Sequence, residues 1–437
     1  MKKIISKLMG GVLMFGLSMS LTSCDPYLDD VLGEWSRPTP GSSTGGAVAV
    51  TSIDLDADEM KLTVGDKGQL NITDVAPADA TDKTVSWSSN KEEIATVDAN
   101  GLVTAVAVGT AIITAKAGDK TATCKVTVLP TLSTPLTIEA ITAGTITITS
   151  PKVNMKYKKN NESIVTITST TDVDISVSAG DKVEFYGNGT TIKIYNGTTI
   201  VGGTADIKVY GNIMSLVDEE GFATNTELPA IQTFQELFKD NAKLTDASGL
   251  LLPATTLKAS CYWGMFSGCT GLTTVPEKLL PATTLADHCY RSMFENCTGL
   301  TTLPEKLLPA TEMKSNCYSS MFNQCTGLTT LPEKLLPATV MATNCYAYMF
   351  KGCTSLTTAP QLPATNLTNR CYQNMFDGCN KLTTAYVKAA YTTTNSECTD
   401  MLTGCTATGA VLHTTNATSW SGHMGGANWT AVGDWTD

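Results

Sequence analysis

The alternation of apolar and polar positions divides the chain into stretches of different character. Leu8 to Leu21 form an apolar run, and short alternating runs fill the segments from Val50 to Val128 and from residue 131 to residue 212. From Thr233 onward the apolar positions recur in units of 26–28 residues. Alternation with a period of two predicts half-buried strands, and a fixed longer period predicts stacked repeats. The pattern therefore predicts two β-domains followed by a repeat domain.

The segment 50–129 consists of short predicted strands separated by Gly, Asp and Asn residues. Several short strands in about 80 residues are typical of a β-sandwich. The order of residues resembles a bacterial immunoglobulin-like domain of group 2 over the whole segment. The resemblance is carried by Gly65 after LTV, Trp87 in VSWSS, the run IATVDANGLVTAVAVGTAIITA and the closing KVTV. Cys124 is the only cysteine of this segment, so we expect a small buried thiol and no internal disulfide.

Residues 130–212 are again rich in predicted strands, such as TITITS, TIKIY and ADIKVYG. We interpret this segment as a second β-sandwich domain. It resembles the domains that precede repeats in surface proteins of gut bacteria. Neither β-domain contains residues with the spacing of a catalytic site.

Each repeat has an apolar pattern with a period close to four, followed by a short apolar stretch. Cys261 and Met265 are four residues apart, as are Tyr262 and Phe266, which predicts one face of a short helix. The following LTTVP predicts a short strand that Pro276 ends. The first cysteines of the units fall at 261, 289, 317, 345, 371 and 398. Such a period predicts a solenoid in which each coil buries its apolar side against its neighbours.

A degenerate unit precedes the series of repeats. Phe238 lies 28 residues before Phe266, and Thr233 and Asn241 stand at the positions of the two cysteines. Terminal units of solenoids are atypical. We therefore expect this unit to cap the N-terminal end of the stack.

The units resemble leucine-rich repeats of the BspA-like group. The signature that carries the resemblance is Phe266-Ser-Gly-Cys269-Thr-Gly-Leu272. The expected fold class is therefore multidomain, with two β-sandwich (Ig-like) domains followed by an α/β leucine-rich-repeat solenoid. The expected boundaries are 50–129, 130–212, 213–408 for the repeats, and 409–437 for a C-terminal cap.

Two series of cysteines recur in the repeats, and four explanations predict different chemistry. Two cysteines eight residues apart on a helix lie about 12 Å from each other, and no histidine recurs to complete a zinc site. The same distance excludes a disulfide within one helix, which needs Cα atoms within about 7 Å, unless the helix ends early and the second cysteine folds under it. A catalytic thiol needs a fixed base, and although His288 precedes Cys289, no other repeat has a histidine there.

Packing is the remaining explanation of the cysteines. We expect mostly reduced, buried columns, while disulfides between coils stay open as an alternative in an exported chain. The residues with this expected structural role are Cys261, Cys269, Cys289, Cys297, Cys317, Cys325, Cys345, Cys353, Cys371 and Cys379.

The N-terminus has the features of an export signal. Three lysines precede the apolar run, which is shorter than the about 20 residues of a transmembrane helix. The sequence LTSC at 21–24 resembles a bacterial lipobox, which implies a lipid anchor on Cys24. The acidic residues that follow resemble the surface-export signal of Bacteroides-type lipoproteins. We expect a signal peptide at 1–23, a flexible tether at 24–49, and a lipid-anchored, surface-exposed protein of the outer membrane.

The formal net charge of −11 makes nucleic acid and anionic membrane surfaces poor partners. We therefore expect contact with the membrane through the lipid anchor only. No nucleophile–base pair, phosphate-binding loop or metal set is present in the sequence. The chain is expected to be no enzyme and to need no cofactor or metal.

Two columns of repeated side chains are the candidate binding face. A sugar or an extended peptide could lie along either column; the alternative is that the tyrosines pack between coils and the threonines only favour strands. We expect a cell-surface adhesion protein whose partner is a host or bacterial surface protein or glycan. The alternatives are a structural coat or glycan-binding component without an adhesin role and, more remotely, a thiol hydrolase. The candidate residues are Thr273, Thr301, Thr329, Thr357, Thr383, Tyr262, Tyr290, Tyr318, Tyr346 and Tyr372.

Overall fold

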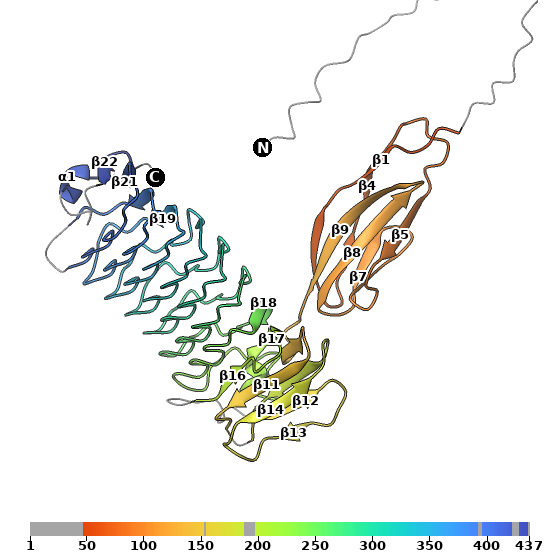
Figure 1. Cartoon of the computed structure of the whole chain (residues 1–437), viewed down its shortest axis with the longest axis horizontal. Coiled ribbons are helices and arrows are strands. Elements are labelled where there is room, and N and C mark those ends of the chain that lie inside the picture. The colour runs from red at the N-terminus through yellow and green to blue at the C-terminus, as the bar shows by residue number, and fades with distance from the viewer. Residues whose placement is uncertain (1–46, 153, 188–196, 392–395, 422–427, 436–437) are drawn as a thin grey trace, which may run out of the picture. The chain divides into compact units, whose positions relative to one another are not determined.

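The computed structural model describes residues 47–152, 154–187, 197–391, 396–421 and 428–435 (Figure 1). The predicted signal peptide, Cys24 and nearly all of the predicted tether lie outside these residues. Within the described ranges the chain consists of strands and turns, apart from the short α1 (Ala417–Trp420) and the 3-10 helix η1 (Ile213–Leu216). None of the described helices has the length and apolar character needed to cross a membrane.

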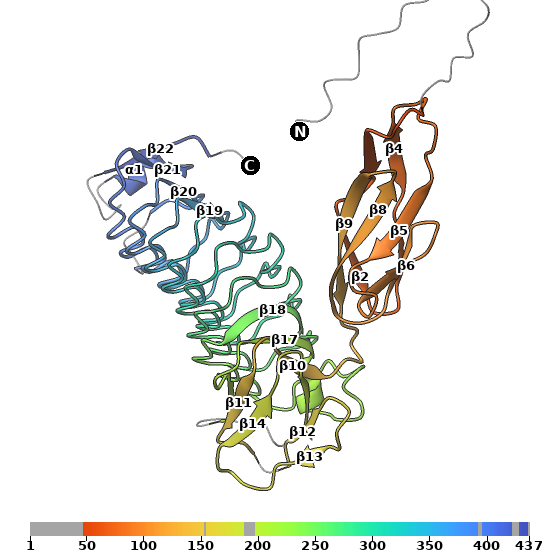
Figure 2. The ribbon, with the colours of Figure 1, turned by 45° about the vertical axis from the view of Figure 1, so that its right-hand side comes forward.

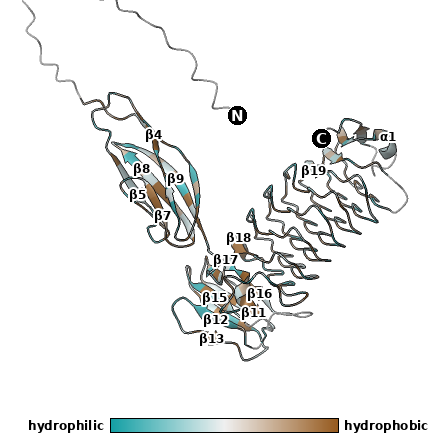
Figure 3. Cartoon of the chain, turned by 180° about the vertical axis from the view of Figure 1, so that it is seen from behind, coloured by the Kyte–Doolittle hydropathy of each residue, from teal (hydrophilic) through white to brown (hydrophobic). Residues whose placement is uncertain are grey.

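The segment 50–129 forms an Ig-like β-sandwich, as predicted. Its strands are β1 (Ser52–Leu55), β2 (Glu59–Thr63), β3 (Lys67–Gln69), β4 (Ile72–Ala76), β5 (Val85–Ser89), β6 (Ala95–Val97), β7 (Leu102–Ala105), β8 (Gly109–Ala117) and β9 (Lys120–Leu129). They form a four-stranded sheet in the order β2-β9-β8-β5, a three-stranded sheet in the order β3-β7-β6, and the pair β1-β4. Apolar and polar residues alternate along β8 and β9 (Figure 3). Most of the apolar ones are buried in a cluster with β6 and β7, and Ala115 and Ala117 are buried in a second cluster with β1.

Trp87 of β5 packs against both apolar clusters of this domain. The backbone of Gly101 comes so close to the indole that a Cβ at this position would lie 2.7 Å from Trp87 Cζ2, and Gly101 has a φ of +80°. Glycine meets both requirements because it has no side chain. Cys124 is fully buried and free. Trp87 thus fills the interior of the sandwich, and the turn at Gly101 packs directly against its ring.

Residues 136–212 form a second pair of sheets, and the larger sheet includes one strand from the repeats. The strands are β10 (Leu136–Ala140), β11 (Gly144–Thr149), β12 (Lys156–Lys159), β13 (Val165–Thr166), β14 (Val173–Val177), β15 (Lys182–Tyr186), β16 (Thr199–Val201), β17 (Ile207–Asn212) and β18 (Leu244–Leu251). The two sheets have the orders β13-β12-β15-β10-β17-β18 and β14-β11-β16. Ile138, Ile146 and Phe185 are fully buried in the core that these sheets share.

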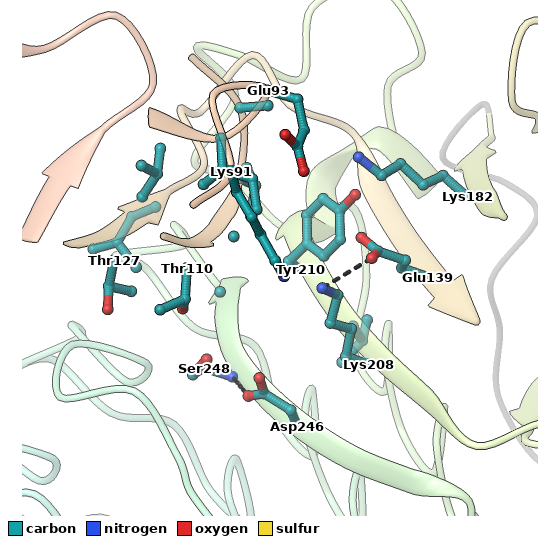
Figure 4. Close-up of a pocket in the computed structure, with 18 residues that line it drawn as sticks. Lys91, Glu93, Thr110, Thr127, Glu139, Lys182, Lys208, Tyr210, Asp246 and Ser248 are labelled. Carbon is teal, nitrogen blue, oxygen red and sulfur yellow. Dashed lines mark hydrogen bonds and ion pairs between the residues drawn. The ribbon is translucent and has the colours of Figure 1, made fainter. Parts of the chain in front are cut away.

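The polar face of the larger sheet carries charges that pair with one another. Lys208 Nζ of β17 lies 2.9 Å from Glu139 Oε1 of β10, and Figure 4 shows this pair beside Tyr210. Burial, followed by the negative charge of Glu139, raises the pKa of Tyr210. Lys156 and Glu219 form a further pair at 2.6 Å. These pairings neutralise the charged groups of the face locally.

The larger sheet joins the second β-domain to the repeats. β18 pairs in parallel with β17, with Ile207 opposite Leu244 and Asn212 opposite Leu251. One continuous cluster of buried residues also extends from β10 to the C-terminal end of the repeats. The sheet and the core therefore cross residue 212, where the sequence suggested a boundary.

Each repeat contains a ribbon of overlapping turns in the place of the predicted helix. In the first full repeat, the N–H groups of alternate residues from Cys261 to Cys269 donate to the carbonyl three residues earlier, at 3.0–3.3 Å. Every fourth residue has a positive φ, as at Ser260 (56°), Gly264 (61°) and Gly268 (76°). A left-handed residue in the third position is the requirement of a type II turn. Turns of this type alternate along the ribbon with turns whose third residue, such as Tyr262, is not left-handed.

The other N–H groups of the ribbon connect each coil to the next. Phe266 N donates to Met293 O at 2.9 Å, and equivalent bonds join neighbouring ribbons from residue 234 to residue 401. Equivalent side chains then stack, as in Phe266 and Phe294, whose ring centroids lie 5.4 Å apart with 3° between the planes. The regular stack of coils is visible in Figures 1 and 2.

The helix predicted for each repeat is not formed in the described residues, so the structure does not support the α/β class predicted for the solenoid. The prediction used a period close to four, and two overlapping turns also advance the chain by four residues. A helix would need bonds between residues four apart, and L-residues do not tolerate a left-handed conformation inside it. The left-handed residue in every fourth position is therefore compatible with turns and incompatible with a helix.

The threonine stretch of the first, degenerate coil lies in β18, and in later coils this stretch forms named strands only near the C-terminal end of the described residues. There a parallel sheet forms in the order β19 (Thr358–Leu362), β20 (Thr384–Val387), β21 (Ala410–Thr414) and β22 (Trp429–Val432). Earlier coils are linked by single bridges, such as the bridge between Thr330 and Thr358. At the C-terminal end, Trp420 of α1 is fully buried and its Nε1 donates to Ala389 O at 3.0 Å. Residues of the expected C-terminal cap thus continue the parallel sheet.

Candidate functional site

The second cysteine of each repeat donates a hydrogen bond to the preceding coil. Cys269 Sγ lies 3.0 Å from Phe238 O, and Cys297 Sγ lies 3.0 Å from Phe266 O. The same contact, at 3.0–3.2 Å, is made by Cys325, Cys353, Cys379 and Cys405. A thiol is a weak donor that also packs as a small apolar group. Each of these cysteines therefore satisfies a backbone carbonyl inside the core.

The thiols of both cysteine columns are buried and have low reactivity. All 13 cysteines among the described residues are free and buried. Burial raises the pKa of Cys261 and of Cys269 to about 12, so the reactive thiolate is scarce near neutral pH. In the part of the chain that the structure describes, no group of three or more His, Cys, Asp or Glu side chains could hold a metal ion. The thiols of both columns therefore pack neighbouring coils against each other.

The last coil has a different register from the one that the cysteine spacing suggests. Ser396 and Asp400 have positive φ and correspond to Ser260 and Gly264 of the first repeat. Glu397 therefore stands at the position of the first cysteine, and Tyr372 N donates to its carbonyl at 2.8 Å. Cys398 stands one residue later, at the position of the tyrosines. The predicted assignment of Cys398 as a first cysteine is wrong.

The tyrosine column is not a binding face, and this part of the prediction is wrong. Its rings are at most 1% exposed and stack between coils, with centroids 5.6–6.2 Å apart. A ligand in solvent cannot reach a side chain that is covered on all sides. The alternative reading, in which these rings pack between the coils, describes the arrangement of Tyr262, Tyr290, Tyr318, Tyr346 and Tyr372.

The predicted threonine column is exposed along the stack. We call it column A; its members are Thr273, Thr301, Thr329, Thr357 and Thr383. Thr357 Oγ1 donates to Thr329 O at 3.1 Å, and Thr383 Oγ1 donates to Thr357 O at 3.1 Å. Because these hydroxyl protons point to the preceding coil, the oxygen retains its capacity to accept a hydrogen bond from a ligand. Column A is a row of fixed, exposed acceptors and methyl groups.

A second exposed threonine column was not recognised in the sequence. We call it column B; its members are Thr255, Thr283, Thr311, Thr339 and Thr365. The signal was present in the repeated LPAT, whose Ala is buried and whose Thr is exposed in each coil. A buried–exposed–exposed–buried order, as in Ala282 to Leu285, is shared with the stretch that contains column A. The coils therefore offer two threonine edges, one before and one after each ribbon.

Comparison with known proteins identifies the first domain. Residues 83–129, which contain strands β5 to β9, match the family described as Bacterial Ig-like domain. The chain is similar to the Ig-like virion protein of Serratia phage KSP90, with 41% identity over 116 residues that cover 26% of this chain and 42% of the relative.

Two further relatives share shorter stretches. The A type blood N-acetyl-alpha-D-galactosamine deacetylase of Flavonifractor plautii is 39% identical over 77 residues, which cover 18% of this chain and 10% of that protein. The alpha-L-arabinofuranosidase of Bifidobacterium longum subsp. longum is 44% identical over 69 residues, which cover 16% of this chain and 6% of that protein. The chain thus spans less than half the length of each of these relatives. With the fold described above, these likenesses make the chain a multidomain protein of strands and turns that carries a bacterial Ig-like domain.

Proposed function

We propose that this chain is a non-enzymatic protein of the cell surface whose repeat domain binds an extended glycan along column A. The Ig-like domain and the likeness to an Ig-like virion protein support a surface or structural role. The single observation that carries the proposal is the row of exposed threonines on the stack of coils, four of which hold their hydroxyl group on the carbonyl of the preceding coil.

The spacing of column A favours a ligand with a short repeat. Thr383 N donates to Thr357 O at 2.9 Å, and Thr357 N donates to Thr329 O at 3.1 Å. Bonds of this kind hold neighbouring backbones about 4.7–4.9 Å apart. Polar groups that are held on a rigid scaffold bind without a large loss of side-chain entropy. A ligand with one polar group per coil would meet each threonine in turn.

An extended peptide fits this spacing less well than a linear glycan. Side chains on one face of a strand repeat every ~6.6–6.8 Å, which is longer than the distance between coils. The side chains of a peptide that lies along column A would therefore lose register with the threonines within a few coils. A linear chain of hexopyranose rings carries hydroxyl groups on every ring and can offer one polar group to each coil. Two relatives bear the names of enzymes that act on glycans, and this favours a glycan partner as well.

The remaining parts of the proposal concern chemistry and location. Buried thiols with raised pKa values favour a protein without a catalytic nucleophile. The sequence LTSC at 21–24 favours a lipid anchor on Cys24 and a location on the outer membrane, exposed at the cell surface. Metabolic labelling with a fatty-acid analogue should modify the wild type and not the variant Cys24→Ala. Equal labelling of both would exclude the anchor.

The binding face is tested by two matched triple variants on a glycan array. Variant A carries Thr301→Val, Thr329→Val and Thr357→Val, which remove three hydroxyls of column A and keep side-chain shape. Variant B carries Thr283→Val, Thr311→Val and Thr339→Val in column B. For a glycan that the wild type binds, we expect variant A to lose affinity by about tenfold or more, since several hydrogen bonds are lost, and variant B to bind as the wild type does. Equal loss in both variants, or in neither, contradicts the assignment to column A.

A structural coat component is the second candidate function. The likeness to a virion protein favours it. A coat component should form ordered assemblies by itself, visible by light scattering and electron microscopy at rising protein concentration. A chain that remains monomeric and binds a glycan excludes this alternative.

A further inference from the structure

The outward positions of the ribbons do not repeat in the way that the packed positions do. One position directly follows the stacked ring of each coil, which is Phe234 in the first coil and a tyrosine in the others. Its residues are Gln235, Trp263, Arg291, Ser319, Ala347 and Gln373; the small Ser319 and Ala347 are buried, and the others are partly exposed. Side chains that recur in every coil serve the stacking of neighbours. A large aromatic and a cationic side chain that occur in only two adjacent coils are not needed for that stacking. They are candidates for recognition.

Arg291 lies over the ring of Trp263. Its Cζ is 5.2 Å from the ring centroid, which is the distance of a cation–π contact. Stacking through the face of the guanidinium fixes its plane and leaves the N–H groups of its edge for other partners. An edge of this kind forms paired hydrogen bonds with a carboxylate.

Other cations on the ribbons have carboxylate partners. Lys239 Nζ lies 2.7 Å from Glu236 Oε1, and Lys351 Nζ lies 2.9 Å from Asp377 Oδ2. Lys351 also lies over an aromatic ring, as Arg291 does. Within the described residues, Arg291 differs from both lysines because it forms no ion pair.

The acids on the coil of Arg291 are engaged elsewhere. Asp287 Oδ1 accepts a hydrogen bond from Ser315 N at 3.0 Å. Glu295 Oε1 accepts one from Asn323 Nδ2 at 2.7 Å. The guanidinium of Arg291 therefore has a planar ring on one face and no carboxylate at its edge.

Three polar atoms around this pair are buried without a hydrogen-bond partner. They are Arg291 Nε, His288 Nδ1 and Gln235 Oε1. The ring of His288 lies 6.4 Å from that of Trp263. Buried polar atoms without partners are costly and rare, and three of the eight among the described residues belong to these neighbouring side chains.

We infer that Trp263, Arg291 and His288 form a subsite that binds the carboxylate of an acidic sugar. The choice of a sugar as the bearer of the carboxylate rests on the proposed function. The subsite itself lies on the outward face of the ribbons and is separate from columns A and B. It would give the protein a preference for acidic over neutral glycans.

The test uses the full chain and three soluble probes in isothermal titration calorimetry at low salt. The probes are an oligosaccharide that contains glucuronic acid, the matched oligosaccharide of glucose, and a short glutamate peptide. The wild type should bind the acidic oligosaccharide about tenfold or more tightly than the neutral one. Arg291→Gln should remove this preference. Arg291→Lys should keep only part of it, because lysine lacks the planar guanidinium that forms paired hydrogen bonds with a carboxylate. Arg370→Gln, which changes an exposed arginine of another coil, is the matched control and should bind as the wild type does.

The outcomes separate this inference from the proposed function. Equal affinity for both oligosaccharides, or an acidic preference that survives Arg291→Gln, overturns the subsite and leaves the proposal for column A intact. A glutamate peptide that binds as tightly as the acidic oligosaccharide, and through Arg291, overturns the assignment to a sugar. No binding of either oligosaccharide counts against both. A cooperative thermal transition of each variant shows that a loss of binding is not a loss of folding.

Discussion

The side-chain amide of Asn241 donates a hydrogen bond from Nδ2 to Ile200 O at 3.0 Å, in the position where each later coil has a cysteine thiol. The amide oxygen of Asn241 also accepts a bond from Lys243 N at 3.1 Å. Strand β16, which contains Ile200, thus stands where a preceding coil would lie. Asparagine replaces cysteine there because the first coil must satisfy groups of a strand and a turn at once.

Replacing Asn241 should therefore show how the stack is capped. Asn241→Ala removes the bonds to a buried carbonyl and to a part-buried N–H, at a cost of about 1–3 kcal/mol in the free energy of unfolding. Asn241→Cys should cost less, because the thiol donates to the carbonyl as in the other coils. Urea denaturation followed by circular dichroism measures both. An alanine variant as stable as the cysteine variant would show that the amide does not cap the stack.

The cysteine columns predict a contrast between folded and unfolded thiols. A thiol reagent at neutral pH should label almost no cysteine of the folded chain, because the thiols are buried and protonated. The same chain unfolded in guanidinium without reductant should react at most of its repeat cysteines. The count of labelled thiols by mass spectrometry decides. Two or fewer labelled repeat cysteines after unfolding would mean that the columns are disulfide-linked.

Stability should fall at alkaline pH. Burial raises the pKa of Cys261, Cys269 and Cys405 from 9.0 to about 12, and that of Cys371 to about 11. The folded chain holds protons that the unfolded chain releases above pH 9.0, so the stabilisation is complete below 9.0 and is lost as pH rises towards these values. Within this window, each such thiol lowers the free energy of unfolding by about 1.4 kcal/mol for every pH unit of increase. The urea midpoint, measured with reductant present between about pH 8 and about pH 10.5, should fall steeply; a flat profile would contradict burial of the thiols.

Tyr318 provides a test of the buried hydroxyls. Its hydroxyl oxygen is buried and has no hydrogen-bond partner, although its ring stacks on Tyr290 at 5.8 Å. Tyr318→Phe removes the unpaired group and keeps the ring, so we expect the free energy of unfolding to stay the same or rise. Tyr318→Ala, the control for packing, should cost about 3–5 kcal/mol. A clear loss of stability in the phenylalanine variant would reveal a bound water or another partner of the hydroxyl.

The coil register predicts which deletions are tolerated. Deleting residues 297–324 joins Asn296 to Cys325, and Asn296 is equivalent to the deleted Gln324. The shortened chain should unfold cooperatively, because each remaining coil meets a matching neighbour. Deleting 297–310 joins a ribbon to the middle of a loop and should abolish the cooperative thermal transition. The reverse result would show that the coils are not the stacking units.

The sequence was sufficient for the β-domains and for the period of the repeats, because both follow from the spacing of apolar residues. It could not distinguish turns from a helix over eight residues, where periods of 3.6 and 4 both place Cys261 and Met265 on the inward side. The left-handed positions did contain a signal. Gly, Ser and Asn recur there, as in Gly264, Ser292 and Asn374, and these residues tolerate or favour turns.

Whether the tyrosines are buried also depends on whether the segment forms a helix or a ribbon of turns. On a helix of two turns, Tyr262 lies beside the apolar face and could remain in contact with solvent. In a ribbon of turns, adjacent residues such as Cys261 and Tyr262 both point inward. The contact between Trp263 and Arg291 joins residues 28 positions apart, and it became visible only when the coils were stacked.

The hydrogen bonds between ribbons all run in one sense, and this gives the stack an electric polarity. In each pair of coils the N–H belongs to the earlier coil and the carbonyl to the later one, as from Tyr372 to Glu397. Aligned peptide dipoles add, so the C-terminal end of the ribbon stack is positive and its N-terminal end is negative, by the same physics that polarises a helix. The last ribbon carries two acids, Glu397 and Asp400, at that positive end. A carboxylate thus stands at the position where the preceding full repeats have a thiol, and the polarity of the stack favours a negative charge at this end.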